Sequence, residues 1–454
     1  MAEDLTQSQD TEFADKGGEL LPTLQKKVIY IMTLGFLGVN MAFSLQGANM
    51  SRIAQTIGAD PNQLGWFFIV PPLLGMIVQP LIGKWSDATW NKWGRRMPYL
   101  IIGGPVAALV LILLPFSGSF GFGYGSIFAL VYMIIAIALM DCFSNISMAP
   151  FRMIIGDMVN DKQRNFAFAW SEIFAYVGGI LASLMPYILT WCGVPNTADK
   201  GVVPPSVVWS FIIAAVVLVV SSLFSGLKTK EYDPQTYAQY HGIDIRKNAQ
   251  EKTNWIELFK NAPRSFWELS VVQFFSWIGI MYTWTYATNT MAVNIWKTSD
   301  SSSAGYQAAG NWYGVMTAVL SLSALAFGWF YSKSSEKHRH HWYAFGLAAD
   351  VVAIALVATT GNKWVALAAF VLYGFGNFCI NTLPFNMLAT ALKKNVGAYM
   401  GAFNIFVCLP QIVGSIAGLF LVPFFGGNTS SMMILGAVFM AISAVAVYFV
   451  HEGK

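Results

Sequence analysis

Long apolar segments separated by short polar connections repeat along the whole chain. A helix needs about twenty apolar residues to cross the hydrocarbon core of a bilayer. Twelve segments approach or exceed that length, and they fall into two sets of six. The first set is 28–50, 64–83, 98–117, 126–149, 166–191 and 206–225, and the second is 268–290, 308–332, 341–360, 363–386, 398–421 and 431–450. The pattern predicts an all-α polytopic membrane protein with twelve transmembrane helices.

The longest polar segment between these spans separates the two sets and marks the boundary between two halves. We therefore predict four parts: an N-terminal tail at 1–27, a six-helix bundle at 28–225, an inter-domain loop at 226–267 and a second six-helix bundle at 268–450. The first twenty residues are polar and acidic, as is typical of a disordered tail rather than a cleavable signal.

Basic residues predict the orientation, because loops on the cytoplasmic side carry an excess of Lys and Arg. The central loop and the connections on its side hold most of them, including Lys84, Arg95 and Arg96. The connections on the other side hold one each or none: Arg52, Lys200, Lys297 and Lys363. We therefore expect the central loop and both termini to be cytoplasmic.

Composition narrows the class of protein further. The chain is 56% hydrophobic and only 11% charged, whereas soluble domains carry about a quarter charged residues. The net charge of +4 is too small to suggest nucleic acid as a partner. No Walker loop, metal-ligand spacing or catalytic constellation is found, so we expect neither an enzyme nor a cofactor or metal. The expected setting is the cell (inner) membrane, with the chain a monomer in the lipid bilayer.

The fourth span ends in a segment of unusual chemistry. Asp141 lies inside the apolar run, where a carboxylate is costly unless it is paired, hydrated or protonated. At about 100° per residue, Asn145 and Arg152 fall on the same helical stripe as Asp141. Arg152 lies roughly 16 Å along the helix, too far to pair with Asp141 directly. We therefore predict an ion pair between Arg152 and Glu172 of the fifth span, toward the cytoplasmic side.

The two halves repeat this segment. Asp141-x-x-x-Asn145 followed by Pro150-Phe151 recurs as Asn377-x-x-x-Asn381 followed by Pro384-Phe385, again in the fourth span of its half. Parallel six-span repeats around a midplane site are the arrangement used for alternating access.

The connection between the second and third spans contains Gly83, Asp87, Gly94, Arg95 and Arg96. A positive-inside anchor loop would explain the two arginines alone. Together, however, these residues resemble the signature loop of the major facilitator superfamily. Their spacing resembles the G-x-x-S-D-(x)6-G-R-R-x-P form of plant sucrose/proton symporters and their animal and bacterial relatives, of the glycoside-pentoside-hexuronide type.

Further motifs in the right order extend the resemblance. They are Gly38-Val39-Asn40 to Gln46, Val78-Gln79-Pro80, Asp141 to Asp157, Ser276-Trp277-Ile278-Gly279, and Gly401-x-x-Asn404 with Leu409-Pro410-Gln411. The resemblance implies a sugar/proton symporter in which Asp141 is the protonatable carboxylate and Arg152 an essential charged residue. Plant members carry four charges just after the seventh span, where this chain has the uncharged segment 286–294. That difference weakens the inference that this chain shares sucrose as a substrate with the plant members.

A neutral Asp141 donates a hydrogen bond to a sugar hydroxyl, whereas the ionised form only accepts. Sugar binding also needs amides and flat aromatic faces. The predicted spans supply these as Asn40, Gln46, Asn145, Trp277, Tyr282, Asn377, Asn381, Asn404 and Gln411. Interhelical hydrogen bonding explains any one intramembrane Asn equally well.

The sequence therefore predicts a proton-coupled symporter for a disaccharide or glucoside, of sucrose or maltose type. The alternatives are a sodium-coupled or uncoupled glycoside transporter and a transporter-like sugar sensor. Sodium coupling would call for acids in the second span, which has none between Leu64 and Gly83. Asp350, halfway through the ninth span, is interpreted as a hydrogen-bonded structural acid in preference to a second proton site.

Overall fold

The computed structural model describes residues 21–91, 93–241, 255–331, 338–392 and 396–451. These residues form helices joined by turns and one isolated bridge between Asn91 and Gly94, which confirms the all-α prediction. The predicted tail up to residue 20, the middle of the central loop and the side chain of Asp87 lie outside the described residues.

The helices follow one another in two series. The first is α2 (Lys26–Thr33), α3 (Gly35–Thr56), α4 (Leu64–Ala88), α5 (Met97–Leu113), α6 (Ile127–Met158), α7 (Asp161–Trp191) and α8 (Pro205–Lys228). The second is α12 (Arg264–Asn294), α13 (Ala304–Tyr331), α14 (Arg339–Thr359), α15 (Lys363–Ala391), α16 (Val396–Phe403), α17 (Ile405–Phe424) and α18 (Thr429–Ala446). Two short helices, α9 (Pro234–His241) and α11 (Trp255–Lys260), lie between the series in the chain.

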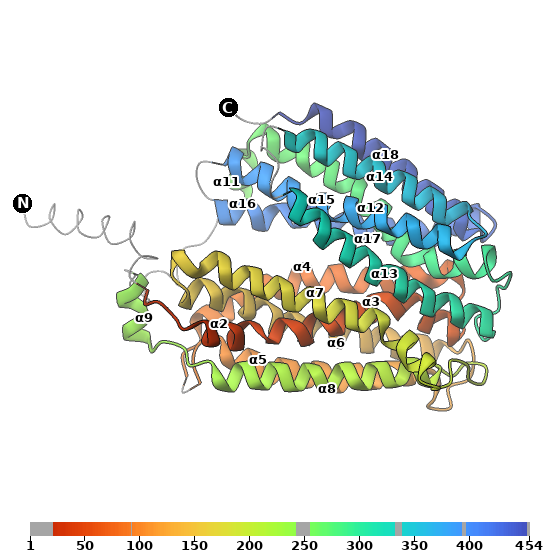
Figure 1. Ribbon diagram of the computed structural model, residues 1–454, viewed down its shortest axis with the longest axis horizontal. Coiled ribbons are helices and arrows are strands. Elements are labelled where there is room, and N and C mark those ends of the chain that lie inside the picture. The colour runs from red at the N-terminus through yellow and green to blue at the C-terminus, as the bar shows by residue number, and fades with distance from the viewer. Residues whose placement is uncertain (1–20, 92, 242–254, 332–337, 393–395, 452–454) are drawn as a thin grey trace, which may run out of the picture.

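Figure 1 shows the two series as two bundles, the first in red to yellow-green and the second in green to blue. They meet mainly where α4 packs on α17 and α7 packs on α13, with α3 also touching α12 and α13. Helices α9 and α11 lie at the same end of the molecule. By the predicted orientation this is the cytoplasmic end and the opposite one the extracellular end, and these names are kept below.

Eleven helical segments of the described chain are long and apolar enough to cross a membrane. The predicted seventh span, α12, is not among them. This helix of 31 residues buries polar side chains such as Gln273, Thr283 and Asn289, which lower its hydropathy. Because α12 packs between α17 and α18 within its bundle, we keep it as a proposed twelfth span.

Several helices continue beyond the apolar run that predicted them. The span predicted to end at residue 50 continues in α3 to Thr56, and the one predicted to end at 149 continues in α6 to Met158. Arg52 and Arg152 are therefore both helical. A helix needs only its own backbone hydrogen bonds to continue, so the end of an apolar run marks a change of surroundings and not the end of the helix.

Candidate functional site

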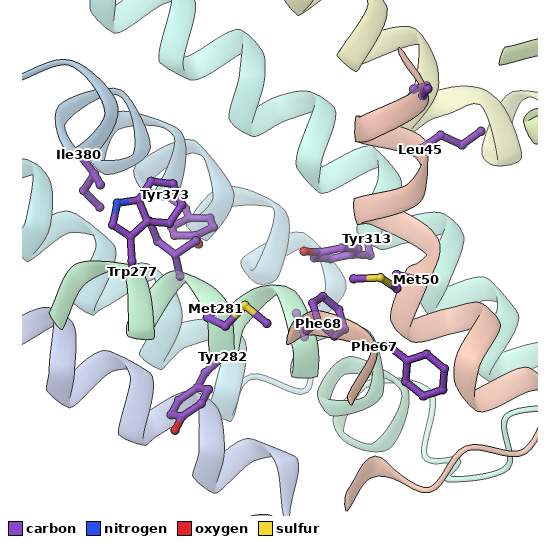
Figure 2. Close-up of a cluster of buried hydrophobic side chains, with 14 of the residues drawn as sticks. Leu45, Met50, Phe67, Phe68, Trp277, Met281, Tyr282, Tyr313, Tyr373 and Ile380 are labelled. Atoms are coloured by element: carbon purple, nitrogen blue, oxygen red, sulfur yellow. The ribbon is translucent and has the colours of Figure 1, made fainter. Parts of the chain in front are cut away.

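A cavity of about 420 Å³ lies between the two bundles. Its volume falls within the range of about 300–1,000 Å³ that is usual for small-molecule sites. Helices α3, α4, α6 and α7 line it from one side, and α12, α13, α15 and α17 from the other. Met50 and Phe68 of the N-terminal half approach Tyr313 of the C-terminal half in its wall (Figure 2). The cavity therefore depends on how the two halves are placed relative to each other.

Asp141 lies in the wall of this cavity and is only 1% exposed. The side-chain amide of Gln46 donates a hydrogen bond of 2.7 Å to Oδ2 of Asp141. The other polar atom of that amide, Oε1 of Gln46, is buried without a hydrogen-bond partner. This pair presents a carboxyl that can take up or release a proton beside an unused acceptor. Sugar hydroxyls are donors and acceptors suited to both groups.

Behind Asp141, two amides continue the polar chain. Nδ2 of Asn145 donates to the backbone oxygen of Asp141 at 2.8 Å, and Oδ1 of Asn145 accepts from Nε2 of Gln79 at 2.7 Å. The other half repeats the first of these contacts, because Nδ2 of Asn381 donates to the backbone oxygen of Asn377 at 2.9 Å. The repeat seen in the sequence is thus also a repeat of hydrogen bonding.

Three of the nine predicted sugar-binding residues line the cavity: Gln46, Asn377 and Gln411. The other six do not lie in its wall: Asn40, Asn145, Trp277, Tyr282, Asn381 and Asn404. Some of their polar groups are used within their own helix. Asn40, for example, donates to the backbone oxygen of Phe36 one turn earlier at 2.9 Å.

The structure adds cavity residues that the sequence reasoning missed. The aromatic face of α12 that reaches the cavity belongs to Trp284, while Trp277 packs edge-on against it with ring centroids 6.0 Å apart. Because 284 is seven residues after 277, about two turns, both lie on one face of the helix. The other missed groups are small hydroxyls and a phenol: Ser44, Ser183, Thr317, Ser321 and Tyr313. Serine and threonine are frequent in transmembrane helices for packing reasons, so no signal in the sequence distinguishes these.

The predicted ion pair between Arg152 and Glu172 is wrong for this conformation. The two side chains do not come within the 4.0 Å of a salt bridge, and both residues are exposed. Neither lines the cavity. The prediction chose Glu172 because the fifth span should hold it at a depth comparable to that of Arg152, but it took no account of the direction in which each side chain leaves its helix.

The interpretation of Asp350 as a hydrogen-bonded acid is also wrong. The carboxyl is fully buried, and neither of its oxygens has a hydrogen-bond partner. It does not line the cavity.

Arg52, which the sequence pattern placed in an extracellular connection, is instead buried at the contact between the halves. Its guanidinium donates to four side-chain amide oxygens: to Gln307 at 2.7 Å, to Asn311 and Asn196 at 2.8 Å each, and to Asn49 at 3.5 Å. Gln307 and Asn311 belong to α13 of the other half, whereas Asn196 belongs to the same half as Arg52. The cation is thus held by neutral acceptors from both sides of the interface.

Further hydrogen bonds join the halves around this cation. Ser51 donates to the backbone oxygen of Thr285 at 2.9 Å, and Asn289 donates to Oε1 of Gln55 at 2.7 Å. Ser301 donates to the backbone oxygen of Gln55 at 2.7 Å. Asn289 belongs to the uncharged segment that departs from the plant pattern. We define these contacts and those of Arg52 as the extracellular layer, which joins the halves just beyond Met50 of the cavity wall.

The signature loop forms a second cluster, at the cytoplasmic end. Both arginines are buried: Arg96 pairs with Asp157 at 2.8 Å and also contacts Ser86, and Arg95 lies over the ring of Tyr237 at 4.8 Å. Since Tyr237 belongs to α9, the cluster attaches the inter-domain loop to the N-terminal half.

Glu231 completes this attachment by capping the start of α5. Its carboxylate accepts from the backbone N–H groups of Arg95, Arg96 and Met97 at 2.7 Å each. Gly94, with φ of +110°, leaves room for it, since a Cβ there would lie 2.8 Å from the Glu231 carboxyl carbon. Burial raises the pKa of Glu231 above its usual value, the nearby charge of Asp157 adds to this, and the three N–H donors oppose it.

Comparison with known proteins gives one consistent result. A family model described as the Major Facilitator Superfamily matches residues 32–415. The sucrose transport protein SUC4 of Arabidopsis thaliana is 20% identical over 451 residues, covering 91% of this chain and 88% of that protein. The sucrose transport protein SUT2 of Oryza sativa subsp. japonica is 23% identical over 456 residues, covering 90% of each.

Solved structures with the same fold include two transporters. A crystal structure of a mutant of the nucleoside transporter NupG has a TM-score of 0.68 at 15% identity and covers 94% of this chain and 100% of that one. A bacterial homolog of the human lysosomal transporter Spinster, inward-facing and occupied, has a TM-score of 0.66 at 14% identity, with 94% and 96% covered. At these identities the likeness concerns the fold alone.

Proposed function

The chain belongs to the Major Facilitator Superfamily of multi-pass membrane transporters, and we propose that within it the protein is a proton-coupled sugar symporter. Its substrate is a disaccharide or glucoside of the sucrose or maltose type. The proposal combines a site that binds one proton with a site that binds one polyhydroxylated solute, both in the cavity between the halves.

The observation that carries this proposal is the position of Asp141. Its carboxyl is buried, faces the cavity and has a single side-chain partner, Gln46. Ionised, the carboxylate accepts from the amide of Gln46; neutral, it has a proton to donate to a sugar hydroxyl. A sugar that accepts this hydrogen bond binds best when Asp141 carries a proton. Proton and sugar then favour each other's binding by the same factor, which is the thermodynamic basis of coupling.

The hydrogen bonds of the extracellular layer support a position in the transport cycle after the layer has closed and before release toward the cytoplasm. Proton and sugar enter when that layer is open, and the layer then closes behind them around Arg52. Release toward the cytoplasm restores the ionised carboxylate, for which Gln46 supplies a hydrogen-bond donor. The two halves thus alternate in exposing one site, as in other transporters built from repeats.

The nature of the solute is supported by the cavity wall and by the relatives. Hydroxyls and amides such as Ser321, Asn377 and Gln411 alternate with the flat face of Trp284. Aromatic faces beside hydrogen-bonding groups suit sugars, which have apolar C–H faces and polar edges. The full-length relatives compared above are named sucrose transport proteins, and the missing charges in 286–294 are the reason to test other glucosides alongside sucrose.

The test is uptake of labelled sugars into proteoliposomes under an imposed pH gradient, acid outside. We expect accumulation of at least one disaccharide or glucoside from a panel that includes sucrose, maltose and monosaccharides. An imposed sodium gradient without a pH gradient should give no accumulation. Accumulation driven by sodium alone would replace proton by sodium coupling, and sugar binding without counterflow would make the protein a sensor.

A further inference from the structure

Asp350 lies midway along α14 and outside the cavity wall. It is fully buried, and neither Oδ1 nor Oδ2 has a hydrogen-bond partner among the residues that the structure describes. The space that it fills is provided by Gly376 of α15, where a Cβ would overlap the carboxyl group. An ionised carboxylate is among the costliest groups to bury without a partner. The groups around Asp350 therefore decide whether its carboxyl is protonated or ionised.

Two titratable groups of α15 face Asp350: Tyr373 and Cys379. Both are neutral groups in their usual state. The thiol of Cys379 donates elsewhere, to the backbone oxygen of Trp342 at 3.4 Å. Helix α18, which also packs on α14, contains no Asp, Glu, Lys, Arg or His between Thr429 and Ala446.

The cations of α14 and of the helices packed on it lie at the helix ends. Lys363 begins α15 at the extracellular end, where it lies over the rings of Trp312 and Trp364. On α14 itself, Arg339 precedes Asp350 by eleven residues, or roughly 16 Å of helix, and donates to Asn386 at 3.3 Å. On α12, Arg264 is paired with Glu268 at 2.6 Å, and Glu268 also binds His451. None of these groups compensates a negative charge at Asp350.

We propose that Asp350 is a second proton-binding site, separate from Asp141, that is loaded in this conformation and exchanges its proton with the cavity through Tyr373. The proposal concerns the C-terminal half alone and does not depend on which solute the cavity binds. The buried acid of the N-terminal half, Asp141, lies on α6 in the cavity wall. The buried acid of the C-terminal half, Asp350, lies on α14 outside that wall.

The route follows from three side chains in sequence. Tyr313 lines the cavity at the boundary between the halves, and Tyr373 lies among the C-terminal helices (Figure 2). Tyr373 lies three residues before Gly376, so on the same face of α15 as the glycine that meets the Asp350 carboxyl. The hydroxyl of Tyr373 is buried beside Thr283 of α12. A phenol can both donate and accept a hydrogen bond, so it can pass a proton to a water on either side.

Infrared spectroscopy of the purified protein at neutral pH tests whether the proton is present. Asp350→Asn should remove the carbonyl stretching band of one protonated carboxylic acid, and Asp141→Asn should leave that band in place. If Asp350→Asn folds poorly, the Asp141→Asn variant labelled with ¹³C at the aspartate carboxyls answers the same question. Asp350 is then the one buried aspartate left among the described residues, and the band should shift. A band that is unchanged in Asp350→Asn, or unshifted by the label, would overturn the assignment.

The rate at which this band shifts on transfer to D₂O tests the route. Tyr373→Phe should slow the shift at least tenfold. Tyr343→Phe is the matched control, since Tyr343 is also a fully buried tyrosine, but lies on α14 itself, seven residues before Asp350 and toward the cytoplasmic end. Equal exchange rates in the wild type and Tyr373→Phe, or equal slowing by both variants, would refute exchange through Tyr373.

Discussion

The extracellular layer allows the closed conformation to be weakened by a single substitution. Asn311 of α13 makes two hydrogen bonds to the other half: its oxygen accepts from Arg52 at 2.8 Å, and its Nδ2 donates to Thr190 at 2.9 Å. A hydrogen bond to a charged group contributes about 1.5–3 kcal/mol and a neutral one about 0.5–1.5 kcal/mol. Asn311→Ala should therefore favour the open extracellular side by about 2–4.5 kcal/mol. Since about 1.4 kcal/mol is a factor of ten, the open fraction should rise roughly 30- to 1,500-fold.

Access to a cysteine behind the layer measures this fraction. Met50 lines the cavity and is only 3% exposed. In right-side-out vesicles, a membrane-impermeant thiol reagent reaches Met50→Cys only when the extracellular layer is open, so the modification rate follows the open fraction. The exposed Cys192 has to be replaced by serine first. We expect Asn311→Ala to accelerate modification by the factor given above.

Asn196→Ala is the matched control. Asn196 also accepts from Arg52 at 2.8 Å, and from Ser206 at 2.7 Å, but all three residues belong to the N-terminal half. Losing these bonds should change the modification rate less than about threefold, because they persist in both conformations. An Asn311→Ala rate within threefold of the wild type, or equal acceleration by both variants, would refute the assignment of this layer as the extracellular gate.

Two further predictions concern the ends of the transport pathway. Gln46→Leu removes the donor to ionised Asp141 and should make proton release less favourable by about 1.5–3 kcal/mol. Steady-state uptake in proteoliposomes should fall at least tenfold, and undiminished uptake would contradict this role. The second prediction concerns Glu231, which precedes α9 in the chain. Its pKa is raised when this segment is docked on the N-terminal half, so Glu231 binds a proton more tightly in the docked state than in the undocked state. Docking is then favoured below that pKa and weakens as the pH rises through it. Amide hydrogen exchange of α9, corrected for intrinsic rates, should show this loss of protection in the wild type and a flat profile in Glu231→Gln; the same slope in both would contradict it.

The apolar pattern was sufficient to predict the fold class and the order of the helices, because the bilayer requires long apolar helices. It failed for Arg52, which it assigned to a loop. The polar residues around Arg52 end the apolar run, but the helix continues and finds amide partners on α13. Hydropathy cannot foresee such partners, since they come from the other half of the chain.

The candidate site was predicted in part for a similar reason. The cost of a buried charge identified Asp141 from its own surroundings, without reference to any other helix. Which amides join it in the cavity depends on rotation of each helix about its axis, which packing decides. Gln46 reaches Asp141, whereas Asn40, six residues earlier, bonds to its own helix. For the same reason Trp277 was predicted as a cavity residue, whereas Trp284 of the same helix lines the cavity.

The most direct test of coupling at Asp141 compares two activities of the Asp141→Asn variant in proteoliposomes. One is uptake of protons on addition of a transported sugar, and the other is counterflow of labelled sugar, which needs no net proton movement. The asparagine keeps the shape of the carboxyl and a hydrogen-bond donor but cannot titrate. We predict that sugar-driven proton uptake is abolished while counterflow persists. Proton uptake at the wild-type rate by this variant would contradict the assignment of Asp141 as the coupling carboxyl.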